Sequence, residues 1–406
     1  MLKRFDPVTS PPRPAERPAE SSSRLRLVPM GAIVFFGFLA IAIPLPVLPL
    51  EIHGTLGFDT LTVGWIIGLQ SIVTVVSRPY GGTVVDRLGS RWAVLAGLPI
   101  ATLAGATYFI ATALSNEGAA LAALAVGRVL LGIGESLFLT GAMTWGIARI
   151  GMARTGLVMA WQGIAMYGAL SAGGMLGVWL IETGGFLAVA AAATLSPLVA
   201  LAVAFATPGA ATVHPSAQAG PRPPLWRVLG LIWRPGMVLA LAAAPYAALA
   251  AFIVLAFADR GWAGAGFAVA AFGGGYILVR LFFAHLPDRL GGVRVAAVSI
   301  AIAAAGQLLM WMAATPTVAL AGAALTGIGF SLVFPSMGVE AIRRVPAGSR
   351  GVAVGGFMAF FDVSLGITGP LAGLIVAGFG YGSLWLAGAF ACLAALALLA
   401  TLRARV

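Results

Sequence analysis

Residues 77–91 read SRPYGGTVVDRLGSR, and they decide the fold because the chain repeats their pattern. Arg78 is followed eight residues later by the motif DRLG at residues 86–89, and Arg280 is followed eight residues later by DRLG at residues 288–291. The two copies are 202 positions apart, about half of the 406-residue chain. A charged, glycine-containing motif that recurs at this distance indicates a protein built from two related halves.

Two further matches keep the same order along the chain. Residues 132–137, GIGESL, recur as GIGFSL at residues 327–332, an offset of 195. A third set has an offset of 196 and pairs Arg154 with Arg350, Gly173 with Gly369, and Gly177 with Gly373. Three matches at nearly one offset are hard to ascribe to chance, and they predict two pseudo-symmetric halves.

The composition predicts a chain that lies mostly in lipid. It is 60% hydrophobic and 9% charged, with a mean hydropathy of +1.00, whereas soluble domains carry about 25% charged residues. Each helical crossing needs roughly 20 mainly apolar residues. The apolar runs therefore predict an all-α membrane protein with twelve transmembrane helices in two six-helix bundles, at residues 28–50, 61–81, 92–114, 119–145, 156–180, 186–206, 236–257, 264–285, 294–314, 317–338, 352–378 and 383–402.

The polar segments predict the domain boundaries and the orientation. We expect a disordered cytoplasmic tail at residues 1–26, bundles at residues 27–206 and 235–406, and a cytoplasmic linker at residues 207–234. The breaks on one side of the membrane hold most of the basic residues, and those on the other side hold only Arg260. Because cytoplasmic loops retain Lys and Arg, both termini are predicted to be cytoplasmic, in a bacterial inner membrane.

Several functions are disfavoured by what the sequence lacks. The net charge of +11 is spread over short loops and forms no dense basic patch, so we expect no nucleic-acid partner. Cys392 is the single cysteine, and His53, His214 and His285 lie far apart, so no metal site and no cofactor are expected. There is no phosphate-binding P-loop, which excludes ATP as the energy source within this chain. An enzyme embedded in the membrane is a remote alternative, because hydrolytic motifs are missing.

The repeated motif also carries a family resemblance. Residues 82–91 resemble the signature between the second and third helices of the major facilitator superfamily (MFS). Residues 284–294 resemble a second copy, with Ala284 in place of the first glycine and one extra residue before the last arginine. The resemblance implies the MFS fold and a cytoplasmic gate, whose candidate residues are Gly82, Asp86, Arg87, Gly89, Arg91, Asp288, Arg289, Gly291 and Arg294.

A gate of this kind has a physical reason. Gly82 would let two helices approach closely, and Asp86 would pair with an arginine or cap a helix in one conformation only. Alternating access needs such a contact, because one half of the transporter rocks against the other. The alternative is a tight turn that merely keeps positive charge inside.

Three charged residues within apolar helices are candidates for proton coupling. Arg128 and Glu135 are seven residues apart and so lie on one helix face, and the segment from Arg128 to Gly134 resembles a helix-4 motif of proton-coupled members. We expect Glu135 to exchange a proton, and the alternative is a permanent ion pair with Arg128. Asp362, near the middle of its helix, is the second proton or substrate candidate, and the alternative is a cap for a broken helix.

Polar and aromatic residues on neighbouring helices predict a central cavity. The candidates to line it are Gln70, Trp145, Trp161, Gln162 and Tyr167. Trp145 has an alternative role as an interfacial anchor. For Arg78 and Arg280 we favour side chains that reach the cytoplasmic interface over substrate binding.

The expected function is proton-coupled efflux of a small organic solute by antiport. The glycines between residues 163 and 177 resemble the antiporter motif of exporting members, and close helix packing explains such glycines equally well. Pro44, Pro46 and Pro49, with Ser77-Arg78-Pro79, resemble a branch of bacterial sugar- or drug-efflux permeases. A symporter or a uniporter for uptake is the alternative. The partners are then a solute, protons and the lipid bilayer, and two halves in one chain predict a working monomer.

Overall fold

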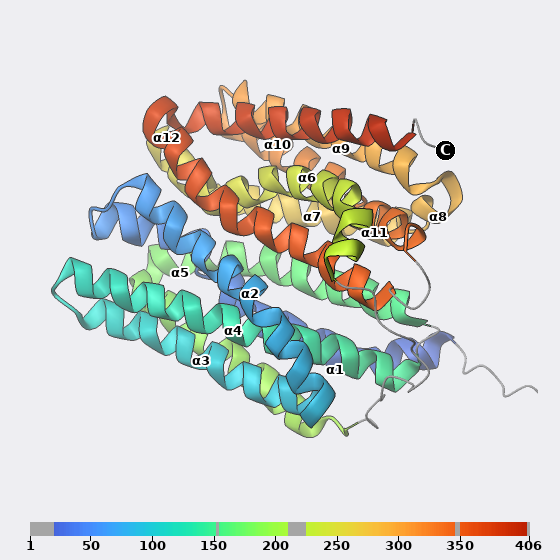
Figure 1. Ribbon diagram of the computed structural model, residues 1–406. Coiled ribbons are helices and arrows are strands. Elements are labelled where there is room, and N and C mark those ends of the chain that lie inside the picture. The colour runs from blue at the N-terminus through green and yellow to red at the C-terminus, as the bar shows by residue number, and fades with distance from the viewer. Residues whose placement is uncertain (1–19, 152–153, 210–224, 346–349, 404–406) are drawn as a thin grey trace, which may run out of the picture.

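The protein is a bundle of long helices (Figure 1). The computed structural model describes residues 20–151, 154–209, 225–345 and 350–403. Every regular element in these ranges is helical: α1 (Glu20–Ala42), the π-helix η1 (Leu50–Thr55), α2 (Thr60–Leu88), α3 (Ser90–Ala113), α4 (Glu117–Ile150), α5 (Thr155–Ala206), α6 (Leu225–Asp259), α7 (Ala265–Phe283), α8 (Leu286–Leu290), α9 (Gly292–Trp311), α10 (Pro316–Phe330), α11 (Val333–Arg343) and α12 (Arg350–Arg403).

Ten helices in the described ranges are long and apolar enough to span a membrane. Two of these apolar spans, 50 residues within α5 and 48 within α12, are about twice as long as one crossing requires. Each helix bends sharply at a glycine with positive φ, Gly185 (66°) in α5 and Gly380 (77°) in α12. Each therefore supplies two crossings, and the predicted all-α membrane fold with twelve crossings is confirmed.

Some predicted boundaries differ from the observed ones. α1 begins at Glu20 and α6 at Leu225, so helix extends into the segments expected to be tail and linker. The first predicted helix, 28–50, is too long, since α1 ends at Ala42 and a turn with Pro44 and Pro46 follows. Proline lacks the backbone N–H that continues a helix, which explains the early end.

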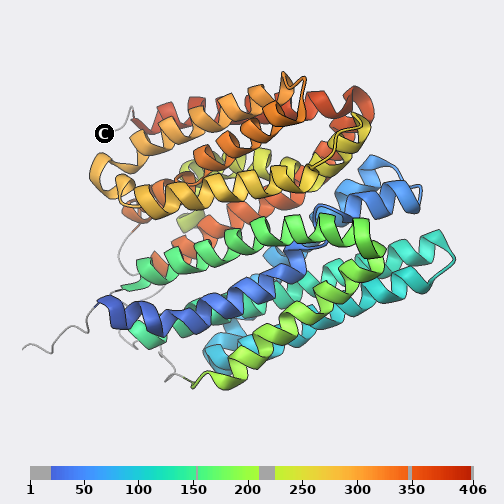
Figure 2. The same ribbon diagram turned by 180° about the vertical axis from the view of Figure 1, so that it is seen from behind.

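The helices form two bundles that lie side by side, α1–α5 and α6–α12 (Figures 1 and 2). They meet mainly where α2 packs on α12 and α5 packs on α7. α1 begins and α12 finishes at one end of the molecule, here named the termini end. The sharp bends within α5 and α12 lie at the opposite end, here named the far end (Figure 1).

The two halves repeat each other in backbone geometry. A one-residue turn at Gly89, with φ 96°, joins α2 to α3, and Gly291, with φ 87°, joins α8 to α9. Gly185 and Gly380 make the second equivalent pair of turns. Only glycine adopts such φ values without strain, so these glycines are required by the turns themselves.

Candidate functional site

A cavity of about 160 Å³ lies between the two bundles. Its walls come from both halves and are mostly apolar, but five charged side chains line it: Arg78, Arg128, Glu135, Arg280 and Asp362. Charged side chains inside a membrane are costly unless they face a cavity or a partner. The cavity is therefore the place in the described chain where polar chemistry is concentrated.

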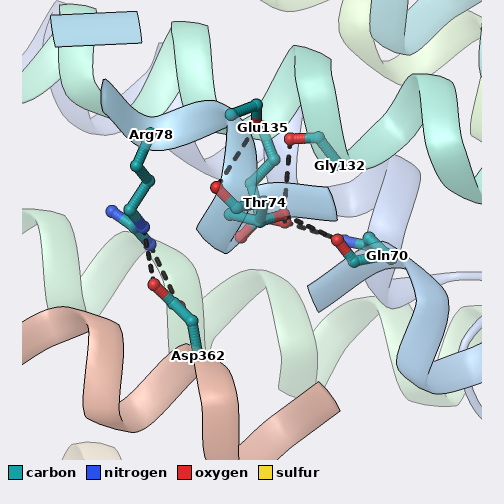
Figure 3. A network of polar contacts seen from close by, with 7 residues as sticks. Gln70, Thr74, Arg78, Gly132, Glu135 and Asp362 are labelled. Atoms are coloured by element: carbon teal, nitrogen blue, oxygen red, sulfur yellow. Dashed lines mark hydrogen bonds and ion pairs between the residues drawn. The ribbon is translucent and has the colours of Figure 1, made fainter. Parts of the chain in front are cut away.

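Glu135 is held by two donors from α2 (Figure 3). Its Oε2 accepts a hydrogen bond from Gln70 Nε2 at 2.8 Å and from the Thr74 hydroxyl at 3.0 Å. The side chain is buried on α4, and it lines the cavity. Gln70, a predicted cavity residue, lines the cavity, and so does Thr74, which carries no signal in the sequence that marks it as a cavity residue.

Arg78 and Asp362 form an ion pair that joins the two bundles (Figure 3). Arg78 Nε lies 2.6 Å from Asp362 Oδ2, and Nη2 donates to Oδ1 at 3.0 Å. Such a two-point contact between guanidinium and carboxylate fixes geometry as well as charge. We expected the Arg78 side chain to reach the cytoplasmic surface of the membrane. That expectation is wrong, because Arg78 pairs with Asp362 on α12 of the other half.

Arg128 does not pair with Glu135. It is buried on α4, and its guanidinium donates to two backbone carbonyls of α2, from Nε to Ile66 at 3.3 Å and from Nη2 to Ile67 at 2.9 Å. The alternative of a permanent Arg128–Glu135 ion pair is therefore wrong for this conformation. The two residues share a helix face and the same cavity, as their spacing predicted, but their partners come from α2.

Two of the five predicted cavity residues do not line it. Gln162 and Tyr167 join Gln70 in the wall, and Gln162 Nε2 donates to the Leu139 carbonyl at 3.3 Å. Trp145 is fully buried among other side chains, so it is neither a cavity residue nor an interfacial anchor. Trp161 lies beside Gly31 of α1, within the N-terminal bundle.

An aromatic cluster that the sequence did not reveal lies at one wall of the cavity: Tyr167, Tyr246, Tyr276 and Phe361 line it, and Phe330 packs against them but is buried. Tyr167 of α5 stacks on Tyr276 of α7 with ring centroids 3.6 Å apart, and Tyr246 stacks parallel to Phe330 at 6.0 Å. Phe361, next to Asp362, stacks on Phe330 at 6.3 Å. The cluster joins helices of both halves, and sequence spacing gives no sign of it because its members come from five different helices.

The gate candidates lie at the termini end, around the turns at Gly89 and Gly291. The side chains of Asp86 and Asp288 lie outside the described part of the structure, so their pairing stays a prediction. Arg91 Nη2 donates to the Phe205 carbonyl at the end of α5, at 3.2 Å. Arg87, Arg289 and Arg294 are exposed.

Gly82 does not have the packing role expected of it, which was to let two helices approach closely. A Cβ at Gly82 would have nothing within 4 Å, so Gly82 makes no close helix contact in this conformation. The neighbouring Gly81 does, since a Cβ there would lie 3.0 Å from Ser136 Oγ of α4.

Over the described residues, no three His, Cys, Asp or Glu side chains are grouped to hold a metal ion.

Comparisons with known proteins agree with this architecture. A sequence profile described as Major Facilitator Superfamily matches residues 30–265 and again residues 261–406. An uncharacterised MFS-type transporter of Pseudomonas aeruginosa is 43% identical over 96% of this chain and 95% of its own length. A similar protein of Salmonella typhimurium is 41% identical over 91% and 94%. A solved peptide transporter of the POT family superposes with a TM-score of 0.72 at 13% identity, covering 95% of this chain and 97% of its own.

Proposed function

This chain belongs to the major facilitator superfamily and is a secondary transporter of the membrane, and from that premise we propose that protons drive its transport of a small organic solute. It is not an enzyme. Glu135 and Asp362 are the residues that bind the coupling protons. The solute occupies the cavity that both carboxylates line.

The single observation that carries this proposal is the ion pair between Arg78 and Asp362. It crosses from one bundle to the other, so it must adjust when the bundles rock. Protonation of Asp362 removes the charge that holds Arg78, and this loosens the link between the halves. Glu135, held by Gln70 and Thr74 in the same cavity, is a second carboxylate that a proton can neutralise.

The termini end is the cytoplasmic end in this proposal, because the basic residues gather there. The repeated turns at Gly89 and Gly291 then belong to the cytoplasmic gate, with Asp86 and Asp288 as its acidic members. The solute reaches the central cavity from one side at a time. The halves that rock are those predicted at residues 27–206 and 235–406.

Two directions of transport are candidates. Export by antiport rests on the glycine run that resembles an antiporter motif. In the structure, close packing alone accounts for three of these glycines, because a Cβ at Gly173 would meet Ala42, one at Gly174 would meet Val269, and one at Gly177 would overlap the Ile43 carbonyl oxygen. Symport is the second candidate, and a specific observation favours it: the cavity holds three arginines and two carboxylates, so it is short of negative charge.

Proteoliposomes with an imposed pH gradient test the proposal. We expect a screen of benzenesulfonate, phenyltrimethylammonium and glucose to find a solute whose movement follows the gradient. Glu135→Gln and Asp362→Asn should each abolish gradient-driven movement while the protein stays folded. Glu182→Gln, an exposed carboxylate at the far end, is the matched control and should transport normally. Full gradient-driven transport by both cavity variants would contradict proton coupling.

A further inference from the structure

Arg280 is a cavity arginine without an acidic partner in the described chain. It lies on α7, where its Nη2 donates to the Tyr276 hydroxyl at 2.9 Å and its guanidinium lies 5.4 Å from the centre of the Tyr276 ring. Its Nε is buried and has no hydrogen-bond partner. Arg78, its counterpart in the repeat, differs because it has an acidic partner: its Nη2 donates to Asp362 Oδ1, and its Nε, although it makes no hydrogen bond, lies 2.6 Å from Asp362 Oδ2.

The internal repeat shows why the two arginines differ. Arg78 and Arg280 are equivalent at the offset of 202, and the helices that carry Asp362 and Met166 are equivalent at the offset of 196. Position 166 is therefore the counterpart of position 362, and it holds a methionine. The repeat would give two equivalent ion pairs, one in each half. Only the Arg78–Asp362 pair is present, because Met166 offers Arg280 no negative charge.

The geometry around Arg280 agrees with this reading of the repeat. α7 packs on α5 as α2 packs on α12. A Cβ at Gly163, one turn before Met166, would lie 3.3 Å from Arg280 Nη2, so the guanidinium reaches across to the neighbouring bundle. Met166 and Arg280 both line the cavity. The guanidinium therefore lies against the turn of α5 that carries Met166, the counterpart of Asp362 in the repeat, and it lines the cavity.

The residues around Arg280 also indicate what the rest of the ligand is like. Tyr276, on which the guanidinium lies, stacks on Tyr167, and the aromatic cluster continues to Tyr246 and Phe330. Guanidinium groups bind planar anionic heads with paired hydrogen bonds, and aromatic faces bind flat apolar bodies. The wall therefore offers a cationic point next to an apolar, aromatic surface.

We propose that the solute of this transporter is an organic anion with a flat or aromatic body, and that Arg280 binds its anionic head at the place that Met166 leaves without a carboxylate. The inference rests on the proposed function, because it names the class of solute that the same cavity takes. The bound anion gives Arg280 the negative charge that Asp362 gives Arg78.

Binding to the purified full-length protein in detergent tests the inference without transport. The probes are benzenesulfonate and benzoate, with benzenesulfonamide and benzamide as neutral counterparts of the same shape and phenyltrimethylammonium as a cation. We expect the two anions to bind at least ten-fold more tightly than their amides. Arg280→Gln should weaken anion binding about ten- to hundred-fold, since a charge-assisted hydrogen-bonded contact is lost. Arg280→Lys, which keeps the charge, should recover part of the affinity.

A second variant tests the repeat itself. Met166→Asp should place a fixed carboxylate beside Arg280 and weaken benzenesulfonate binding at least ten-fold, whereas Met166→Leu should bind as the unsubstituted protein does. Arg343→Gln, at an exposed arginine of α11, is the charge-matched control for Arg280→Gln. The inference is overturned if no anion binds better than its amide, or if Met166→Asp and Arg280→Gln bind benzenesulfonate normally. Proton coupling is judged separately by the pH-gradient assay, so either idea can fail alone.

Discussion

At the scale of single residues, the ion pair between Arg78 and Asp362 does two things at once. It compensates the charge of Asp362, which is 4% exposed in the middle of a membrane protein, and it holds the two bundles together. Removing one member of a buried pair leaves the other charge without compensation, which costs much more than removing both. The pair should therefore show strong coupling in a double-mutant cycle.

We predict that Arg78→Gln and Asp362→Asn each lower the free energy of unfolding by about 3 kcal/mol. The double variant, which has a neutral amide pair at the same place, should regain most of this loss. Thermal unfolding of the purified protein in detergent measures the cycle. The double variant should still fail to couple transport to a pH gradient, because neither amide binds a proton. Additive losses in the double variant would show that the two side chains do not depend on each other.

The sequence predicted the positions of the charged residues of the site well, but it predicted the partners of these residues poorly. Helical spacing placed Arg128 and Glu135 on one face, and the depth of Asp362 in its helix placed it near the middle of the membrane. The partner of Arg78 could not be found in this way, because Asp362 is 284 positions away and the contact depends on how the halves pack. The backbone carbonyls that bind Arg128 carry no signal in the sequence at all.

At the scale of elements, α2 and α12 make the closest contact between the two halves. A Cβ at Gly64 would overlap the carbonyl oxygen of Gly369, and one at Gly373 would overlap that of Thr60. Small residues allow such backbone contact between helices in a membrane. Because these positions lie toward the far end of α2 and Gly369 lines the cavity, we infer that the contact closes the cavity on that side. Hydropathy predicted both helices, but it could not predict which glycines would meet.

We predict that Gly64→Leu prevents this closure and abolishes transport, because the leucine side chain has no room beside Gly369. The protein should stay folded, since each bundle keeps its own packing. A cysteine at Leu45, a cavity residue, should react with a membrane-impermeant maleimide from the far side faster in Gly64→Leu than in the unsubstituted protein. Cys392, the single native cysteine, is buried and gives little background.

The control for this experiment is another glycine in a transmembrane helix. Gly274→Ala on α7 adds a Cβ where nothing lies within 4 Å, so transport and labelling should not change. Equal labelling of Leu45→Cys with and without Gly64→Leu would show that the α2–α12 contact does not close the far end.

At the scale of the whole molecule, the balance of charge in the cavity decides the relation between proton and solute. Arg78, Arg128 and Arg280 face Glu135 and Asp362, so one positive charge is left over when both carboxylates are ionised. Protonation of either carboxylate adds one more unit of positive charge to the cavity. An anionic solute would then be attracted more strongly, and a cationic solute less strongly. This sign distinguishes symport from antiport, because coupling between two ligands is reciprocal.

We predict that an anion bound at Arg280 binds more tightly as the pH falls. Two unit charges roughly 10 Å apart, at an effective dielectric constant of about 20, interact by about 1.7 kcal/mol. Benzenesulfonate should therefore bind about ten-fold more tightly when a cavity carboxylate is protonated than when both are ionised, and the sulfonate itself stays ionised as the pH is lowered. Glu135→Gln should remove much of this dependence, and Glu182→Gln should keep all of it. Tighter binding at low pH means that proton and anion travel together, which is symport. If low pH instead releases the sulfonate, proton and anion compete for one cavity, the charge argument for symport fails, and export in exchange for protons is the candidate that remains.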